Sequence, residues 1–124
     1  MSYEDFIKEV VKQGIEAVKR DYKDPKRKSI REGSIAGFKA CLGKKPLELL
    51  ALLVEADKKS RDEMLIDEQR DVNKYWYARG FANEVRWVCN VVSCLLYNKG
   101  NPTIITPTAR GMLFAAKIVG VKGQ

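Results

Sequence analysis

Apolar residues in the first part of the chain recur at steps of three and four, the spacing of a helix with one buried face. Over residues 3–22 this spacing predicts an amphipathic helix. Its apolar positions are Phe6, Ile7, Val10, Val11, Ile15 and Val18. Pro25 follows shortly afterwards and ends the pattern, because proline breaks the helical hydrogen-bond ladder. Residues 26–28, Lys-Arg-Lys, are then expected to form an exposed basic connector.

A shorter helix is predicted next, from Ser29 as its N-cap to Gly43 as its stop. Glu32 lies three residues after Ser29, the spacing of a capping box. Gly33 and Gly37 weaken the helical pattern. Four residues apart, they share one face, where the missing Cβ atoms would let another backbone or a ligand approach closely.

A third helix begins at Pro46, since proline is favoured in the first turn. It continues to about Lys59, and its leucines lie on nearly all sides. A helix that is apolar all round belongs in the interior. The pattern therefore predicts that this helix is central to the core, with residues 60–71 either extending it or forming a loop.

The C-terminal part contains one long uninterrupted segment. From Val72 to Asn98 there is no proline and only one glycine, which predicts a long helix over about 72–98. Residues 103–106 suit at most a short β element, and Thr106 followed by Pro107 opens a last helix. The sequence thus predicts a single domain over residues 1–124, mainly α, with about five helices.

Composition argues against catalysis and against a metal or other cofactor. The chain has no histidine, the usual general base at neutral pH and the commonest metal ligand. Cys41, Cys89 and Cys94 have no metal-ligand spacing and are expected to be free thiols. The start of the chain is acidic and no run of 18 apolar residues occurs. We therefore expect a cytoplasmic, non-enzymatic protein without membrane contact.

Charge is distributed unevenly. Residues 72–124 contain seven Lys or Arg but a single carboxylate, Glu84, and residues 19–45 are also strongly basic. The first half of residues 72–124 also carries six aromatic residues: Tyr75, Trp76, Tyr77, Phe81, Trp87 and Tyr97. Cations neutralise phosphate and flat rings stack on bases, so the pattern favours an anionic, base-bearing ligand. The alternative is that the acidic segment 46–71 merely balances its basic neighbours.

The long helix has two distinct faces at 100° per residue. Phe81 belongs to the apolar face, whereas Trp76, Asn83 and Asn90 follow one another at seven-residue spacing on the opposite side. Amide and indole groups in one row could bind an anion and a base. Asparagines at heptad spacing are also typical of two helices that pair in register. Both interpretations are compatible with a homo-oligomer whose ligand lies between protomers.

The segment Thr106-Pro107-Thr108-Ala109-Arg110-Gly111 is the other candidate anion site. A helix N-terminus offers free amide donors to phosphate, and Arg110 could add a bidentate contact. Helix capping alone would also explain Thr106.

Three features together resemble the phage anti-Thoeris sponge family. They are the basic stretch Lys26–Ile30, the long helix from Trp76 to Asn90, and the segment Thr106–Gly111. The resemblance implies a protein that sequesters a cyclic ADP-ribose isomer, an immune signal of bacterial hosts, without cleaving it.

The resemblance also implies which residues contact the nucleotide at a protomer interface. They are Phe81, Asn90, Arg110, and Arg27 or Lys28. Apart from the resemblance, Trp87 offers an alternative ring on which a base could stack. Phe81 and Asn90 are half a turn apart on a straight helix. Both can contact one ligand only if different protomers contribute them.

Two other classes compete. Extended residues 104–105 followed by a Thr-Pro helix start are similar to the end of a winged-helix domain, and the pI of about 9.4 suits nucleic acid. No recognition helix precedes that segment, which makes nucleic acid an unlikely partner. A protein-only inhibitor of a host factor is the third class.

Overall fold

The computed structural model describes residues 3–64 and 72–97, with side chains as far as Glu63 in the first range and Val92 in the second. This part of the chain is mainly helical, as predicted, and contains four α-helices and no strand. They are α1 (Tyr3–Asp21), α2 (Lys28–Ala40), α3 (Pro46–Met64) and α4 (Val72–Tyr97). The predicted β element at 103–106 and the last helix lie outside the described residues.

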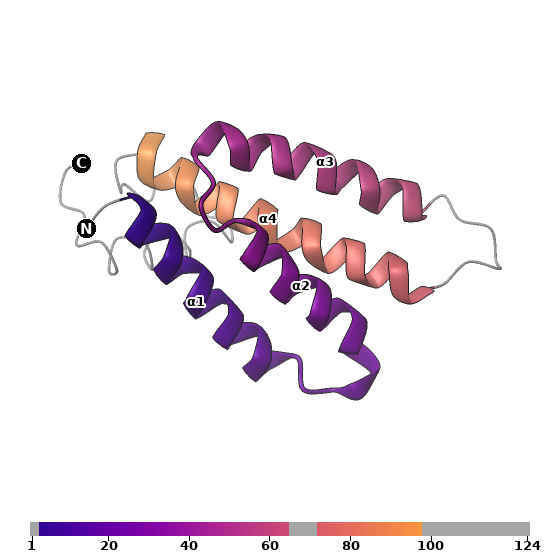
Figure 1. The fold of residues 1–124 in the computed structure, drawn as a ribbon. Helices are drawn as coiled ribbons and strands as arrows, with labels where there is room; N and C mark the ends of the chain where they lie inside the picture. Colours follow the sequence, from indigo (N-terminus) through magenta and orange to yellow (C-terminus); the bar gives the residue numbers. More distant parts are fainter. Residues whose placement is uncertain (1–2, 65–71, 98–124) are drawn as a thin grey trace.

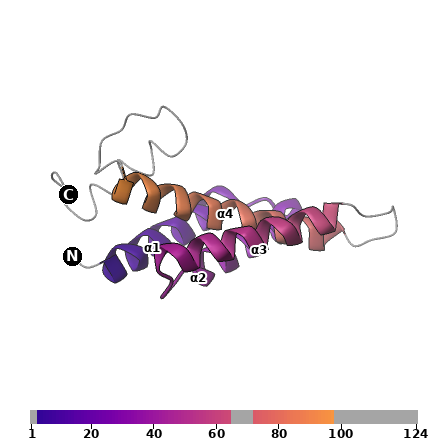
Figure 2. The same ribbon diagram turned by 90° about the horizontal axis from the view of Figure 1, so that it is seen from above.

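The long helix α4 occupies the middle of the bundle. It packs against α2 on one side and α3 on the other, and α1 covers α2 (Figure 1). Neighbours in sequence run in opposite directions, so α2 and α4 run parallel (Figure 1). All four helices follow the long dimension of the molecule (Figure 2). None of the described helices combines the length and apolarity needed to span a membrane.

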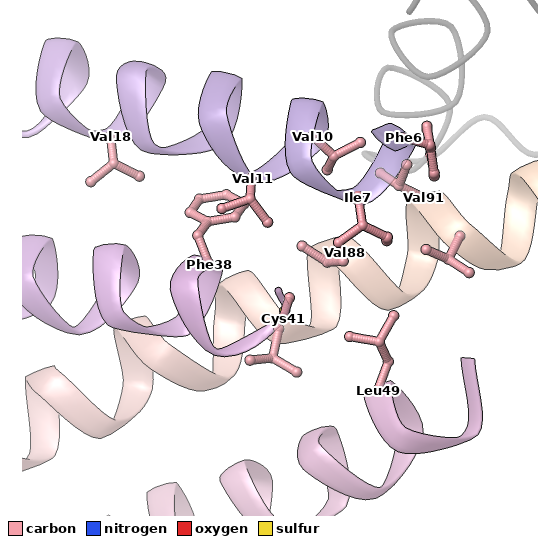
Figure 3. Packing of buried hydrophobic residues seen from close by; sticks show 12 residues of the cluster. Phe6, Ile7, Val10, Val11, Val18, Phe38, Cys41, Leu49, Val88 and Val91 are labelled. Atoms are coloured by element: carbon pink, nitrogen blue, oxygen red, sulfur yellow. The ribbon is translucent and has the colours of Figure 1, made fainter. Parts of the chain in front are cut away.

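The core lies where α1, α2 and α4 meet, and α3 adds the buried residues Leu49 and Ala56. Figure 3 shows Phe6 and Ile7 of α1 directed toward Val88 and Val91 of α4. Leu49 of α3 enters the same cluster from the other side. The apolar spacing of residues 3–22 is therefore confirmed as a buried face.

The second-helix prediction needs correction at its start. Helix α2 begins at Lys28, and its N-cap Arg27 makes no side-chain capping bond. The hydroxyl of Ser29 instead donates to Oδ1 of Asn73 at 3.0 Å, joining the first turns of α2 and α4. Glu32 pairs with Lys28 over 3.9 Å. The capping box is therefore absent, because a tertiary partner takes the hydroxyl that would have capped the helix.

The predicted role of Gly33 and Gly37 is confirmed. A Cβ atom on Gly33 would collide with the backbone carbonyl of Tyr77, and one on Gly37 would lie 2.6 Å from the carbonyl oxygen of Phe81. Gly80 returns the contact from α4, since its Cβ would lie 2.5 Å from the carbonyl oxygen of Ile30. These glycines let two helix backbones touch, which fixes the spacing of α2 and α4.

The prediction that the third helix is central to the core is wrong. Leu47, Leu50 and Val54 of α3 are 79%, 53% and 60% exposed. Helix α3 packs mainly on α4, so two of its five leucines point away from the bundle. The leucine count predicted burial on all sides, but one neighbouring helix can cover only one face.

The basic connector is ordered. Pro25–Arg27 form a short 3-10 helix, which Asp24 caps by accepting the amide N–H of Lys26 at 2.9 Å. This turn joins the end of α1 to the start of α2 and fixes the backbone position of Arg27.

Candidate functional site

A groove of about 600 Å³ lies beside the connector, between the second half of α1 and helix α4. Its walls bring together aromatic, cationic and acidic side chains from four elements. They include Arg20, Tyr22, Arg27, Phe38, Glu84 and Trp87. A volume of this size falls within the usual range for small-molecule sites.

The aromatic part of the groove is built on a close contact between helices. Gly14 of α1 has no side chain, and a Cβ there would collide with the ring of Phe38. The edge of that ring meets Trp87, with ring centroids 5.8 Å apart and planes at 78°. Phe38 is buried, whereas Trp87 is only partly covered and lines the groove. The indole therefore offers a surface on which a flat ring could stack.

The cationic part lies around the connector. The guanidinium of Arg27 is 6.0 Å from the ring centre of Tyr22, and Arg20 contacts the carboxylate of Asp21 at 3.2 Å. Arg31, one turn after Arg27, does not line the groove; its buried Nε has no hydrogen-bond partner among the described residues. Guanidinium groups around one turn suit a phosphate or pyrophosphate group, which accepts several N–H bonds.

Glu84 is the acidic residue of α4 that lines the groove. Burial raises its pKa from the usual 4.5 to about 7, although a hydrogen bond with Ser34 acts in the opposite direction. Ser34 is itself only 1% exposed. No ion pair joins Glu84 to a Lys or Arg within the described part of the chain. At neutral pH this carboxyl group is therefore divided between its neutral and ionised forms.

The structure brings together two of the residues proposed from the sequence, Arg27 and Trp87, because both line the groove. Lys28 does not line it and instead pairs with Glu32 on the surface. Thr106 and Arg110 lie outside the described residues.

The remaining candidates lie elsewhere on α4. Trp76 (42% exposed), Asn83 and the half-buried Asn90 share the outer side of the helix. Phe81 is on the opposite side, where it lines a smaller hollow of about 300 Å³ between α3 and α4. Phe81 and Asn90 thus point in different directions, as expected from their half-turn separation.

The two arginines of the outer α4 face already have partners. Arg86 forms an ion pair with Asp57 of α3, and Nη1 of Arg79 donates to the hydroxyl of Tyr75 at 3.3 Å. These contacts orient both side chains along the protein surface. A ligand on this face would have to compete with them.

Sequence reasoning missed the residues that α1 contributes to the groove. Arg20 lies at the end of α1 and Tyr22 directly after it, and the pattern of this helix indicated only a buried stripe and a charged face. Glu84 is the groove residue that the sequence could have pointed to, because it is the only carboxylate of residues 72–124. Nothing in the sequence indicated that Ser34 would form a hydrogen bond with Glu84.

Within the described ranges, no three cysteine or carboxylate side chains are grouped to hold a metal ion. Cys41 and Cys89 are free thiols; their S–H groups donate to the carbonyl oxygens of Gly37 and Leu49. The side chain of Cys94 lies outside the described residues. No family model, curated protein or solved structure matches the chain.

Proposed function

We propose that the chain is a non-enzymatic nucleotide-binding protein that sequesters a cyclic ADP-ribose-type signalling molecule. Such a protein would counter an antiphage defence in the bacterial cytoplasm by lowering the free concentration of the signal. The observation that carries the proposal is the groove of about 600 Å³ that Arg20, Arg27 and Trp87 all line. A pyrophosphate joined to a base needs a cation and a flat ring within one ligand length.

The chemistry of the groove supports binding more than conversion. A nucleotide sponge needs contacts to the phosphates and the base but no strong nucleophile. The two described thiols are protonated at neutral pH, because burial raises the pKa of Cys41 to about 12 and that of Cys89 to about 11. The chain also has no histidine to activate water. Among the described residues that line the groove, Glu84 has a pKa of about 7 and could transfer a proton near that pH.

The test is to incubate the purified protein with cyclic ADP-ribose isomers, measure their depletion from solution, and analyse what heating releases. We expect depletion followed by recovery of the intact nucleotide. Recovery of a linear product would instead indicate an enzyme, with Glu84 as the candidate proton donor. Failure to deplete any isomer, together with salt-dependent binding to duplex DNA, would favour a nucleic-acid-binding regulator.

Replacing Arg27 with glutamine should weaken nucleotide binding by about 1–3 kcal/mol, the usual value of a charge-assisted contact. Lys28→Gln is a matched control, since it removes the same charge from the adjacent residue, which lies outside the groove. Calorimetric titration of both variants, with melting temperatures to confirm folding, measures the difference. Equal losses in the two variants would mean that general charge, rather than the groove, attracts the ligand.

The outer face of α4 is proposed to pair with a second copy of the chain. Trp76, Asn83 and Asn90 repeat every seven residues there, so a two-fold pairing could place asparagines opposite each other. We expect Asn83→Leu to change the oligomeric state or the register of that pairing. Light scattering with the wild type and the variant tests this. A wild-type monomer at micromolar concentration would contradict the proposal.

A further inference from the structure

The role of Glu84 follows from its unusual surroundings. A carboxylate can accept several hydrogen bonds, yet Ser34 is the only described residue that donates one to it. It also lacks an ionic partner among the described residues. A partly buried carboxylate with so few donors is costly in its ionised form. A ligand group that suits the neutral form of the acid would remove this cost.

Glu84 and Trp87 lie three residues apart on α4, so they are neighbours on one side of the helix, and both line the groove. A base that stacks on the indole would therefore have its edge within reach of the carboxyl group. Arg20 and Arg27 line the same groove, so their guanidinium groups could contact the phosphates of that ligand.

We propose that Glu84, as a neutral carboxyl group, selects an adenine-type base in this groove. The inference rests on the proposed function, because it concerns the nucleotide held there. The hydroxyl of the acid would donate to the ring nitrogen N1 of adenine, and its carbonyl oxygen would accept from the exocyclic amine. Guanine offers an N–H donor where adenine offers the acceptor. It therefore suits the ionised carboxylate instead.

This pairing makes base preference depend on pH. Arg20 and Asp21 of α1, Tyr22 directly after α1, Arg27 of the connector and Ser34 of α2 surround the groove or contact Glu84. Cys41 also influences this region electrostatically, but burial raises its pKa to about 12 and keeps it neutral. Guanidinium groups remain charged throughout the neutral range. Glu84 and Asp21 are the two described carboxylates that line the groove, so the experiment must distinguish which of them causes the pH dependence.

The probes are ADP-glucose and GDP-glucose, which differ only in the base and whose pyrophosphate diesters keep a constant charge near neutral pH. Binding is measured by calorimetry between about pH 6 and pH 8, on either side of the Glu84 pKa of about 7. Affinity for ADP-glucose should rise about tenfold as the pH falls across this range. Affinity for GDP-glucose should change in the opposite direction.

Two variants test the assignment. Glu84→Gln resembles the neutral acid, since its amide donates and accepts, and it should bind ADP-glucose tightly at every pH in the range. Asp21→Asn is the control and should keep the wild-type pH dependence. If both nucleotides bind, and the pH dependence of their affinity is the same in the wild type and in Glu84→Gln, only the role of Glu84 is overturned. If neither nucleotide sugar binds and no cyclic ADP-ribose isomer binds, the proposed function and this inference are overturned together.

Discussion

Replacing Gly33 with alanine is expected to destabilise the protein by about 3 kcal/mol or more, a large share of the stability of a small domain. The added methyl group would collide with the backbone carbonyl of Tyr77. A backbone atom cannot move aside as a side-chain end can, so α2 and α4 would have to separate. That movement would loosen the contact at Gly37 and the buried residues that follow it along both helices. Urea unfolding followed by circular dichroism measures the loss.

The same experiment separates packing from helix propensity. Glycine to alanine in an exposed helix stabilises by about 1 kcal/mol, because alanine is the better helix former. Ala36→Gly, on the same helix, is therefore expected to cost about 1 kcal/mol. If Gly33→Ala stabilised the protein while Ala36→Gly destabilised it, propensity would dominate and the close approach of the two helices would be refuted.

The local patterns of the sequence were sufficient for most of the fold. Helical spacing over residues 3–22 and the uninterrupted segment after Val72 predicted α1 and α4 within one residue at each end. Gly33 and Gly37 predicted the close approach of another backbone or of a ligand, because two glycines four residues apart leave a flat strip on a helix; the structure shows a backbone there. These features depend on interactions within one turn or one helix face.

Predictions that depended on a partner helix were weaker. The leucines of α3 indicated burial, but only the arrangement of helices shows that α3 lies at the edge of the bundle. Ser29 suited an N-cap, but Asn73, which is 44 residues away, accepts its hydroxyl hydrogen. Neither outcome can be read from local spacing, because both depend on which helices become neighbours.

The candidate groove illustrates the same limit. The cationic and aromatic residues of the sequence, Arg27 and Trp87 among them, predict binding of an anionic ligand that carries a base. These two residues share a groove with Arg20 and Glu84 because α1 and α2 pack side by side next to α4. The pKa of Glu84 likewise depends on burial, which the residue type does not indicate.

The partly buried Glu84 also predicts how stability changes with pH in the absence of ligand. The pKa of Glu84 is raised from 4.5 to about 7 in the folded protein. Folding therefore favours the protonated acid. Its contribution is fully present below about pH 4.5 and is lost as the pH rises through about 7. The shift corresponds to about 3 kcal/mol between these limits.

Glu84→Gln should remove this dependence, because the amide is neutral at every pH and keeps a similar shape. We expect the variant to be more stable than the wild type by up to about 3 kcal/mol at pH 8, with little difference at pH 5. Urea unfolding at both pH values measures this change. Glu63→Gln is a suitable control, since it removes a carboxylate near the end of α3, outside the groove. A stability difference between wild type and Glu84→Gln that stayed the same at both pH values would show that Glu84 is ionised and solvated in the folded protein. The groove would then hold a permanent negative charge, which would favour guanine-type or cationic ligands over adenine.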